Sequence, residues 1–185
     1  MPKNYFSLYE FTRKGFPEKP TPLEQYLLNG ITHTLNIIRE DIASPITISD
    51  CYRSVDKYHS MVARGYNPSP TSDHFWGQAI PTMRSKDIDK YGTYYTYSVG
   101  AVDFVVSKLD MEIVFKKIIN LSKKGEIEIG QCILETNPKR NVKWIHISNS
   151  KDYVLNKDLI SKLNIAKYKF LRSDDNGKTY QIVEV

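Results

Sequence analysis

The sequence predicts an α+β fold, with N-terminal helices packed on a small, mostly antiparallel sheet that ends in a β-hairpin. Between Leu28 and Ile42 apolar residues recur at steps of three and four, as on one face of a long helix. Residues 129–134 and 143–147 are apolar enough to form paired central strands. Asp-Asp-Asn-Gly at 174–177 separates two further strand-like segments. Helices therefore precede most strands along the chain, which is typical of the α+β class.

Two capping boxes mark the starts of the first helices. Residues 7–10 read Ser-Leu-Tyr-Glu, and residues 21–24 read Thr-Pro-Leu-Glu with proline at the first helical position. The first helix is expected to be short, because Lys-Gly-Phe-Pro follows at 14–17. The second helix is expected to end before Pro45.

The rest of the chain divides at glycine, proline and polar stretches. Ser54 is a candidate cap for a helix that runs to about Arg64, and a Gly/Pro-rich loop is expected over 65–70. Residues 81–99 are rich in Tyr, Lys, Thr and Gly without an apolar period, which indicates a loop or short hairpin. The remaining expected elements are a strand at 46–49, a buried strand at 101–106, a helix at 111–121, and hairpin strands at 167–172 and 179–185.

Length and composition favour a single globular domain over residues 1–185, with no internal repeat. Hydrophobic residues make up 41% of the chain and charged residues 25%, which is ordinary for a globular protein. Cys51 and Cys132 are too few for a disulfide framework and lack metal-type spacing. We therefore expect both cysteines to be small buried residues.

The formal net charge is +5, with a pI near 9.0. The lysines are spread along the chain, and no basic-aromatic motif of a nucleic-acid-binding module is present. We therefore expect no nucleic-acid partner. The charge fits attraction to an anionic polymer such as bacterial cell wall, and it fits a solvated basic surface without a partner equally well.

Targeting signals are not evident. Residues 1–6 lack the apolar core of a signal peptide, and no apolar run approaches the length of a membrane span. We therefore expect synthesis in a cytoplasm without a transmembrane segment, so that any extracellular target is reached by another route.

The most definite chemistry in the chain comes from His74, Asp103 and His146. Two imidazoles and one carboxylate form the ligand set of a catalytic zinc site whose fourth position is open. An aspartate that enters an apolar strand must find a cation or several hydrogen-bond donors. Strand alternation places His146 on the face opposite Ile145 and Ile147, where it would face a cleft. Each histidine taken alone could instead be a satisfied polar residue of a loop or strand.

Four short motifs occur in order along the chain: Tyr-Arg-Ser at 52–54, Ser-Asp-His-Phe-Trp-Gly-Gln-Ala at 72–79, Val-Asp at 102–103 and Trp-Ile-His at 144–146. Together they resemble the zinc D-alanyl-D-alanine carboxypeptidases and their small phage-type branch of peptidoglycan peptidases. That family has a Tyr-Arg-Ser element, a Ser-x-His-x-x-Gly-x-Ala-x-Asp motif and a closing Trp-x-His strand. With further similarity at 6–11 and 131–135, the resemblance covers residues 5–150 and leaves out the expected C-terminal hairpin at 165–185.

The resemblance implies one zinc ion held by His74, Asp103 and His146. It implies hydrolysis of a peptide bond in the peptidoglycan stem peptide by a zinc-activated water. Arg53 would lie over the substrate carbonyl and stabilise developing oxyanion charge. Ser72 would hold the metal-site loop or the substrate, and Trp144 would contact the substrate.

Two departures from the family pattern bear on activity. The family's aspartate follows the first histidine by seven residues, but position 81 here is proline, so we infer an insertion after Ala79 before the motif resumes at Asp103. Some branches place an acid three residues before the last histidine, where this chain has Lys143. Glu135 is the substitute candidate for the general base, and Asp73 is a weaker one.

These features leave two functions in competition. One is an active cell-wall peptidase of carboxypeptidase or endopeptidase type, phage-encoded and either released to the wall or carried in the virion. The other is a structural virion component that keeps the peptidase fold without its activity and contacts other virion proteins. The insertion and Lys143 favour the second; the complete ligand set favours the first.

Overall fold

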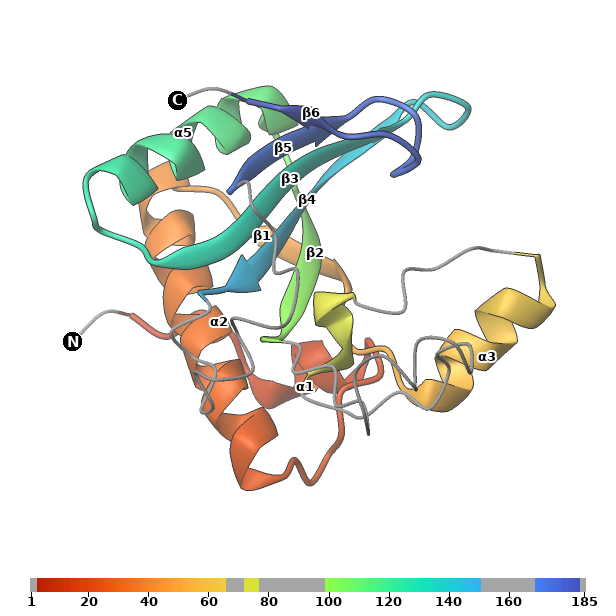
Figure 1. Ribbon diagram of the computed structural model, residues 1–185. Coiled ribbons are helices and arrows are strands. Elements are labelled where there is room, and N and C mark those ends of the chain that lie inside the picture. Colours follow the sequence, from red (N-terminus) through yellow and green to blue (C-terminus); the bar gives the residue numbers. More distant parts are fainter. Residues whose placement is uncertain (1–2, 66–71, 77–98, 151–168, 184–185) are drawn as a thin grey trace, which may run out of the picture.

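The computed structural model describes residues 3–65, 72–76, 99–150 and 169–183 of the chain. Helices and one six-stranded mixed sheet make up this part, so the predicted α+β class is confirmed (Figure 1). The expectations for 66–70 and 81–98 lie outside the described residues.

The helices begin where the sequence places their caps. Glu10 accepts a hydrogen bond from the Ser7 backbone N–H at 2.7 Å, and Glu24 accepts one from that of Thr21 at 2.8 Å. Both capping boxes therefore form as predicted. The helices are α1 (Leu8–Thr12), α2 (Pro22–Ile42), α3 (Val55–Ala63) and α5 (Met111–Lys123), with a short 3-10 helix η1 (Asp73–Phe75).

The strands form one sheet in the order β1-β2-β4-β3-β5-β6. Neighbouring strands are antiparallel except for β3 and β5, which are parallel. The mostly antiparallel sheet and its C-terminal hairpin are thus present. The strands are β1 (Ile46–Asp50), β2 (Ala101–Val106), β3 (Ile129–Asn137), β4 (Val142–Asn149), β5 (Phe170–Ser173) and β6 (Gln181–Ile182).

The two faces of the sheet differ in chemistry. Helices α2 and α5 lie along one face, as Figure 1 shows, and the side chains of the central strands beneath them are fully buried. Because side chains alternate along a strand, the intervening residues project from the other face. The candidate metal ligands Asp103 and His146 project from that second face. The buried residues of the helix-covered face include Val102, Phe104, Leu134, Ile145 and Ile147.

Both cysteines are buried and free, as the sequence predicted. Within the described ranges, each helix is too short or too polar to cross a bilayer.

Candidate metal centre

His74, Asp103 and His146 meet in space although they are far apart in the sequence. One potential ligand atom from each lies within 4.8 Å of the others. Asp103 Oδ1 is 3.2 Å from His74 Nε2 and 2.9 Å from His146 Nδ1. The two histidines are only 3% and 8% exposed. The structure therefore forms a compact, buried group that could hold a metal ion.

The pairing of β2 with β4 brings two members of this group together. Asp103 and His146 are direct Cα partners in this antiparallel ladder. Directly opposite side chains project from the same face of a sheet, so both groups point away from the helix-covered core. The register of two strands thus fixes the carboxylate against the imidazole.

His74 reaches the same point from η1. The Ser72 hydroxyl accepts a hydrogen bond from the His74 backbone N–H at 3.4 Å, which caps this short helix. The backbone N–H of Arg53 donates to the His74 carbonyl at 2.8 Å. His74 Nδ1 lies 2.7 Å from the carbonyl oxygen of Cys51, to which Trp76 Nε1 also donates at 3.1 Å. Because a carbonyl oxygen only accepts, this contact makes Nδ1 a protonated nitrogen, and it directs Nε2 toward Asp103. Metal-binding histidines commonly donate a hydrogen bond from the ring nitrogen that does not bind the metal.

Gly100, immediately before β2, allows the strand to approach η1 closely. A Cβ atom at this position would lie 2.7 Å from the Trp76 ring, and its φ of +79° is one that other residues rarely adopt. The glycine at the start of the Gly-Ala-Val-Asp segment thus has a packing role beside the metal centre.

Charges and hydrogen bonds within the centre shift the pKa values of Asp103 and His74. Burial opposes ionisation of Asp103, but the neighbouring His74 and hydrogen bonds from both imidazoles hold the pKa of its carboxyl well below the usual range. Burial acts most strongly on His74 and lowers its pKa, but the charge and hydrogen bond of Asp103, together with the charge of Asp50, outweigh burial, so the pKa of His74 is raised. Asp103 is therefore an ionised carboxylate that contacts both imidazoles.

The donor set suits a borderline transition-metal ion. Imidazole nitrogen with one carboxylate oxygen is a set that zinc accepts, leaving a coordination position for solvent or substrate. The backbone contact to His74 Nδ1 supports this use, because the other ring nitrogen is then left to face the ion.

Glu135, the candidate base, lies on β3 of the same sheet face. Its Cα pairs with that of Trp144 on β4, two residues before His146. Burial and then the Asp103 charge raise the pKa of Glu135 to about 7, while the charges of both ligand histidines and Arg53 oppose the rise. Glu135 therefore lies within electrostatic reach of Asp103, both histidines and Arg53.

The aromatic and acidic candidates around the centre have defined places. The Arg53 guanidinium lies 5.9 Å from the centroid of the Phe75 ring, next to His74 in the sequence. Trp144 is half-buried on the site face of β4. Burial raises the pKa of Asp73, and the charges of His146 and His74 oppose this, so Asp73 also lies within electrostatic reach.

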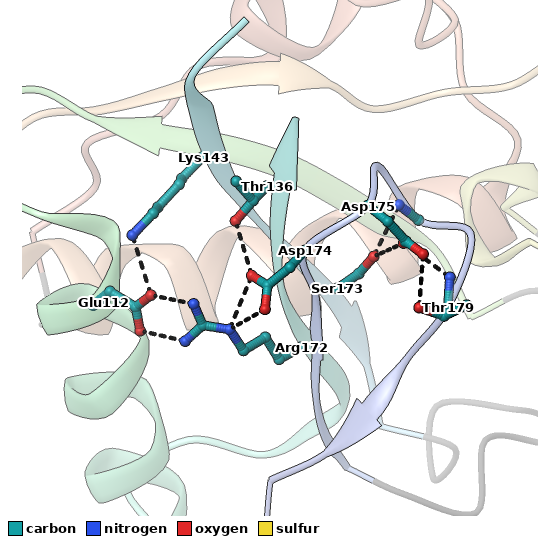
Figure 2. A network of polar contacts seen from close by, with 9 residues as sticks. Glu112, Thr136, Lys143, Arg172, Ser173, Asp174, Asp175 and Thr179 are labelled. Atoms are coloured by element: carbon teal, nitrogen blue, oxygen red, sulfur yellow. Dashed lines mark hydrogen bonds and ion pairs between the residues drawn. The ribbon is translucent and has the colours of Figure 1, made fainter. Parts of the chain in front are cut away.

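Lys143 points away from the metal centre. Its ammonium group lies 3.1 Å from Glu112 Oε1 on α5, so the side chain projects from the face of the sheet that α5 covers (Figure 2). Positions 143 and 146 differ by an odd number of residues, so they project from opposite faces of β4. In this chain the position three residues before the last histidine does not face the metal centre.

Several supporting groups were not identified from the sequence. The Cys51 carbonyl is a backbone atom, and no side-chain signal distinguishes it. Trp76 was noted only as a motif position, although an aromatic residue two places after a candidate ligand is a natural packing partner.

No family model, curated protein or solved structure matches this chain.

Proposed function

We propose that the protein is a zinc-dependent peptidase that hydrolyses a peptide bond in the stem peptide of bacterial peptidoglycan. One observation carries the proposal: two imidazoles and a carboxylate from three separate elements converge within 4.8 Å. The substrate class rests on the motifs at 52–54, 72–79, 102–103 and 144–146, which resemble those of zinc D-alanyl-D-alanine carboxypeptidases.

His74, Asp103 and His146 would hold the zinc ion. When bound, zinc polarises the scissile carbonyl and makes hydroxide available near neutral pH. The complete ligand set supports catalysis despite the insertion that separates Ala79 from Asp103.

Two residues of the chain would act beside the metal. Glu135 would accept the proton of the attacking water and pass it to the leaving amine, a role that suits a carboxyl group whose pKa is about 7. Arg53 would stabilise the negative charge that develops on the carbonyl oxygen, because a fixed guanidinium holds a charge close to the reacting atoms.

The second candidate function is a virion component that keeps this fold without catalysis. The observation that favours it is Lys143, which occupies the position of an acid in some branches of the family that the motifs resemble and here pairs with Glu112. Glu135 on the site face weakens that argument, because it provides a carboxyl group from the neighbouring strand.

Metal analysis combined with a hydrolysis assay tests the proposal. Purified protein is reconstituted with zinc, measured for metal content, and incubated with peptidoglycan fragments whose products are identified by mass spectrometry. About one zinc per chain and a cleaved stem peptide would support a peptidase. Zinc without cleavage would favour the virion component, and no zinc after reconstitution would contradict the metal site itself.

A further inference from the structure

The loop of the C-terminal hairpin lies against the candidate base. A Cβ atom at Gly177 would lie 3.2 Å from Glu135 Oε2 and 3.1 Å from the Tyr180 hydroxyl oxygen. Gly177 also has a φ of +75°, which disfavours any other residue. The carboxylate and the phenol therefore both lie against the same side of Gly177, in space that a side chain there would fill.

Hydrogen bonds centred on Asp175 fix the shape of this loop. Its carboxylate accepts from the hydroxyls of Ser173 at 2.9 Å and Thr179 at 2.7 Å, and from the backbone N–H groups of Lys178 and Thr179. The Ser173 hydroxyl in turn accepts from the Gly177 N–H at 2.9 Å. Figure 2 shows the contacts of Asp175 with Ser173 and Thr179. Gly177 is thus held in place by the loop itself.

Ionic contacts anchor the same hairpin to the body of the protein. Arg172 binds Glu112 of α5 through both guanidinium Nη atoms, at 3.1 and 2.9 Å, and its Nε binds Asp174 (Figure 2). The Asn176 backbone N–H donates to the Thr136 carbonyl of β3 at 2.9 Å. Thr136 follows Glu135 directly, so the loop is tied to the strand that carries the candidate base.

The Tyr180 hydroxyl faces the loop glycine Gly177. The residue is 49% exposed, yet burial and then the negative charges of Glu135 and Asp103 raise the pKa of its hydroxyl to about 12. The hydroxyl thus lies against Gly177 and within electrostatic reach of Glu135 and Asp103.

We propose that the C-terminal hairpin completes the active site, with Gly177 and Tyr180 acting as positioning residues for the Glu135 carboxylate. The inference rests on the proposed peptidase function and adds a role for the C-terminal hairpin, which lies outside residues 5–150 that carry the motifs. The loop limits where the carboxylate can lie, so that Glu135 faces the metal centre in one orientation. A base must lie within hydrogen-bond reach of its proton, so a small displacement lowers turnover more than substrate affinity.

Two alanine variants at matched glycines provide the first test. Gly177→Ala places a methyl group against Glu135 and Tyr180, whereas Gly125→Ala imposes similar backbone strain, at a φ of +72°, with no atom within 4 Å. We expect Gly177→Ala to lower kcat roughly tenfold or more, with KM and zinc content close to those of Gly125→Ala. Equal kcat in the two variants, at equal zinc content, would overturn the proposal.

A second pair covers the case in which Gly177→Ala fails to fold. Tyr180→Phe removes only the hydroxyl, and Tyr9→Phe makes the same change at a 66% exposed tyrosine on α1. Tyr180→Phe is expected to lower kcat and to shift the side-chain carboxyl ¹³C resonance of Glu135 in the metal-free protein, and Tyr9→Phe to do neither. An unchanged Glu135 resonance in Tyr180→Phe would overturn the proposal.

The resonance measurement also separates this inference from the proposed function. It needs neither metal nor substrate, and Glu135→Gln identifies the signal by its loss. If the wild-type protein hydrolyses nothing while the resonance shifts in Tyr180→Phe alone, the peptidase proposal fails and the contact between hairpin and Glu135 stands. If the wild type is active and the resonance is unchanged, the hairpin proposal fails alone.

Discussion

Asp103 and His146 are direct partners across β2 and β4, and Asp103 Oδ1 lies 2.9 Å from His146 Nδ1. The same oxygen lies 3.2 Å from His74 Nε2. One carboxylate oxygen of Asp103 therefore contacts both imidazoles. An ion that binds here must replace these contacts and displace the protons that support them, which couples metal affinity to pH.

Replacing Asp103 should abolish metal binding. Asp103→Ala removes the group that contacts both imidazoles and leaves two ligands, too few for a stable zinc site. We expect zinc content to fall from about one per chain to under about a tenth, as measured by elemental analysis after dialysis. Asp41→Ala is a suitable control, because it removes a surface carboxylate paired with Lys117. Full zinc content in Asp103→Ala would disprove the ligand assignment.

Zinc affinity should weaken as pH falls. Burial acts to lower the pKa of His74, but the charge and hydrogen bond of Asp103, together with the Asp50 charge, raise it above its ordinary value of 6.5, so the proton competes with the ion already near neutrality. We expect a loss of about tenfold in affinity per pH unit for each proton displaced, beginning above pH 6.5. Competition titrations with a chromophoric chelator at several pH values would measure the slope. An affinity independent of pH down to about pH 6 would contradict this assignment.

The stability of the metal-free protein should depend on Glu135. Its pKa is raised from 4.5 to about 7, so ionising it costs the folded state more than the unfolded state. This contribution to stability is present below pH 4.5 and is lost as pH rises through 7. Glu135→Gln should therefore gain stability relative to wild type at high pH, by at most about 3 kcal/mol.

Urea unfolding of chelator-treated protein at two pH values measures this effect. The quantity compared is the difference in free energy of unfolding between Glu135→Gln and wild type. Comparing this difference at about pH 8 with its value at about pH 4 cancels the contributions of other groups. The same difference at both values would show that the Glu135 carboxyl is not perturbed.

Much of the fold was predictable because its signals are local. Helix α2 follows from a capping box, one apolar face and Pro45, all within a single stretch of chain. The parallel pairing of β3 with β5 has no such signal, since it joins segments that are distant in the sequence. The position of Tyr180 beside Glu135 depends on that pairing, which explains why residues 165–185 carried no functional expectation.

The three candidate metal ligands were predictable from the sequence, whereas the groups that hold them in place were less so. His74, Asp103 and His146 are identified by residue type and motif, and strand register then brings two of them together. Alternation along β4 places Lys143 on the face opposite His146. Glu135 of the neighbouring strand β3 instead lies on the same face as His146, because it pairs with Trp144. The contact from the Cys51 carbonyl to His74 involves only a backbone atom, so the residue type at position 51 does not encode it.

Arg53 should affect turnover and leave the metal in place. Its backbone N–H, which contacts His74, is retained in any substitution, whereas Arg53→Ala removes the guanidinium charge near Glu135 and His74. We expect kcat to fall about 100-fold with zinc content unchanged. Arg53→Lys keeps a charge but loses the planar fork, so it should recover part of the activity. Loss of zinc in Arg53→Ala, in parallel with activity, would make the side chain structural.

Substitution of Lys143 and of Glu135 should affect kcat differently. Lys143 occupies the sequence position of the base in some branches of the family that the motifs resemble, whereas Glu135 is assigned as the base because it lies on the site face of β3. Lys143→Ala breaks a partly exposed ion pair with Glu112 on the helix-covered face, so we expect at most about 1 kcal/mol of destabilisation and unchanged kcat. Glu135→Gln keeps the shape of the side chain but cannot accept a proton, and it should lower kcat by about 100-fold or more at full zinc content. Steady-state kinetics on a stem-peptide substrate, with zinc content measured in parallel, would compare the two. A large loss of kcat in Lys143→Ala together with an active Glu135→Gln would reverse the assignment of the base.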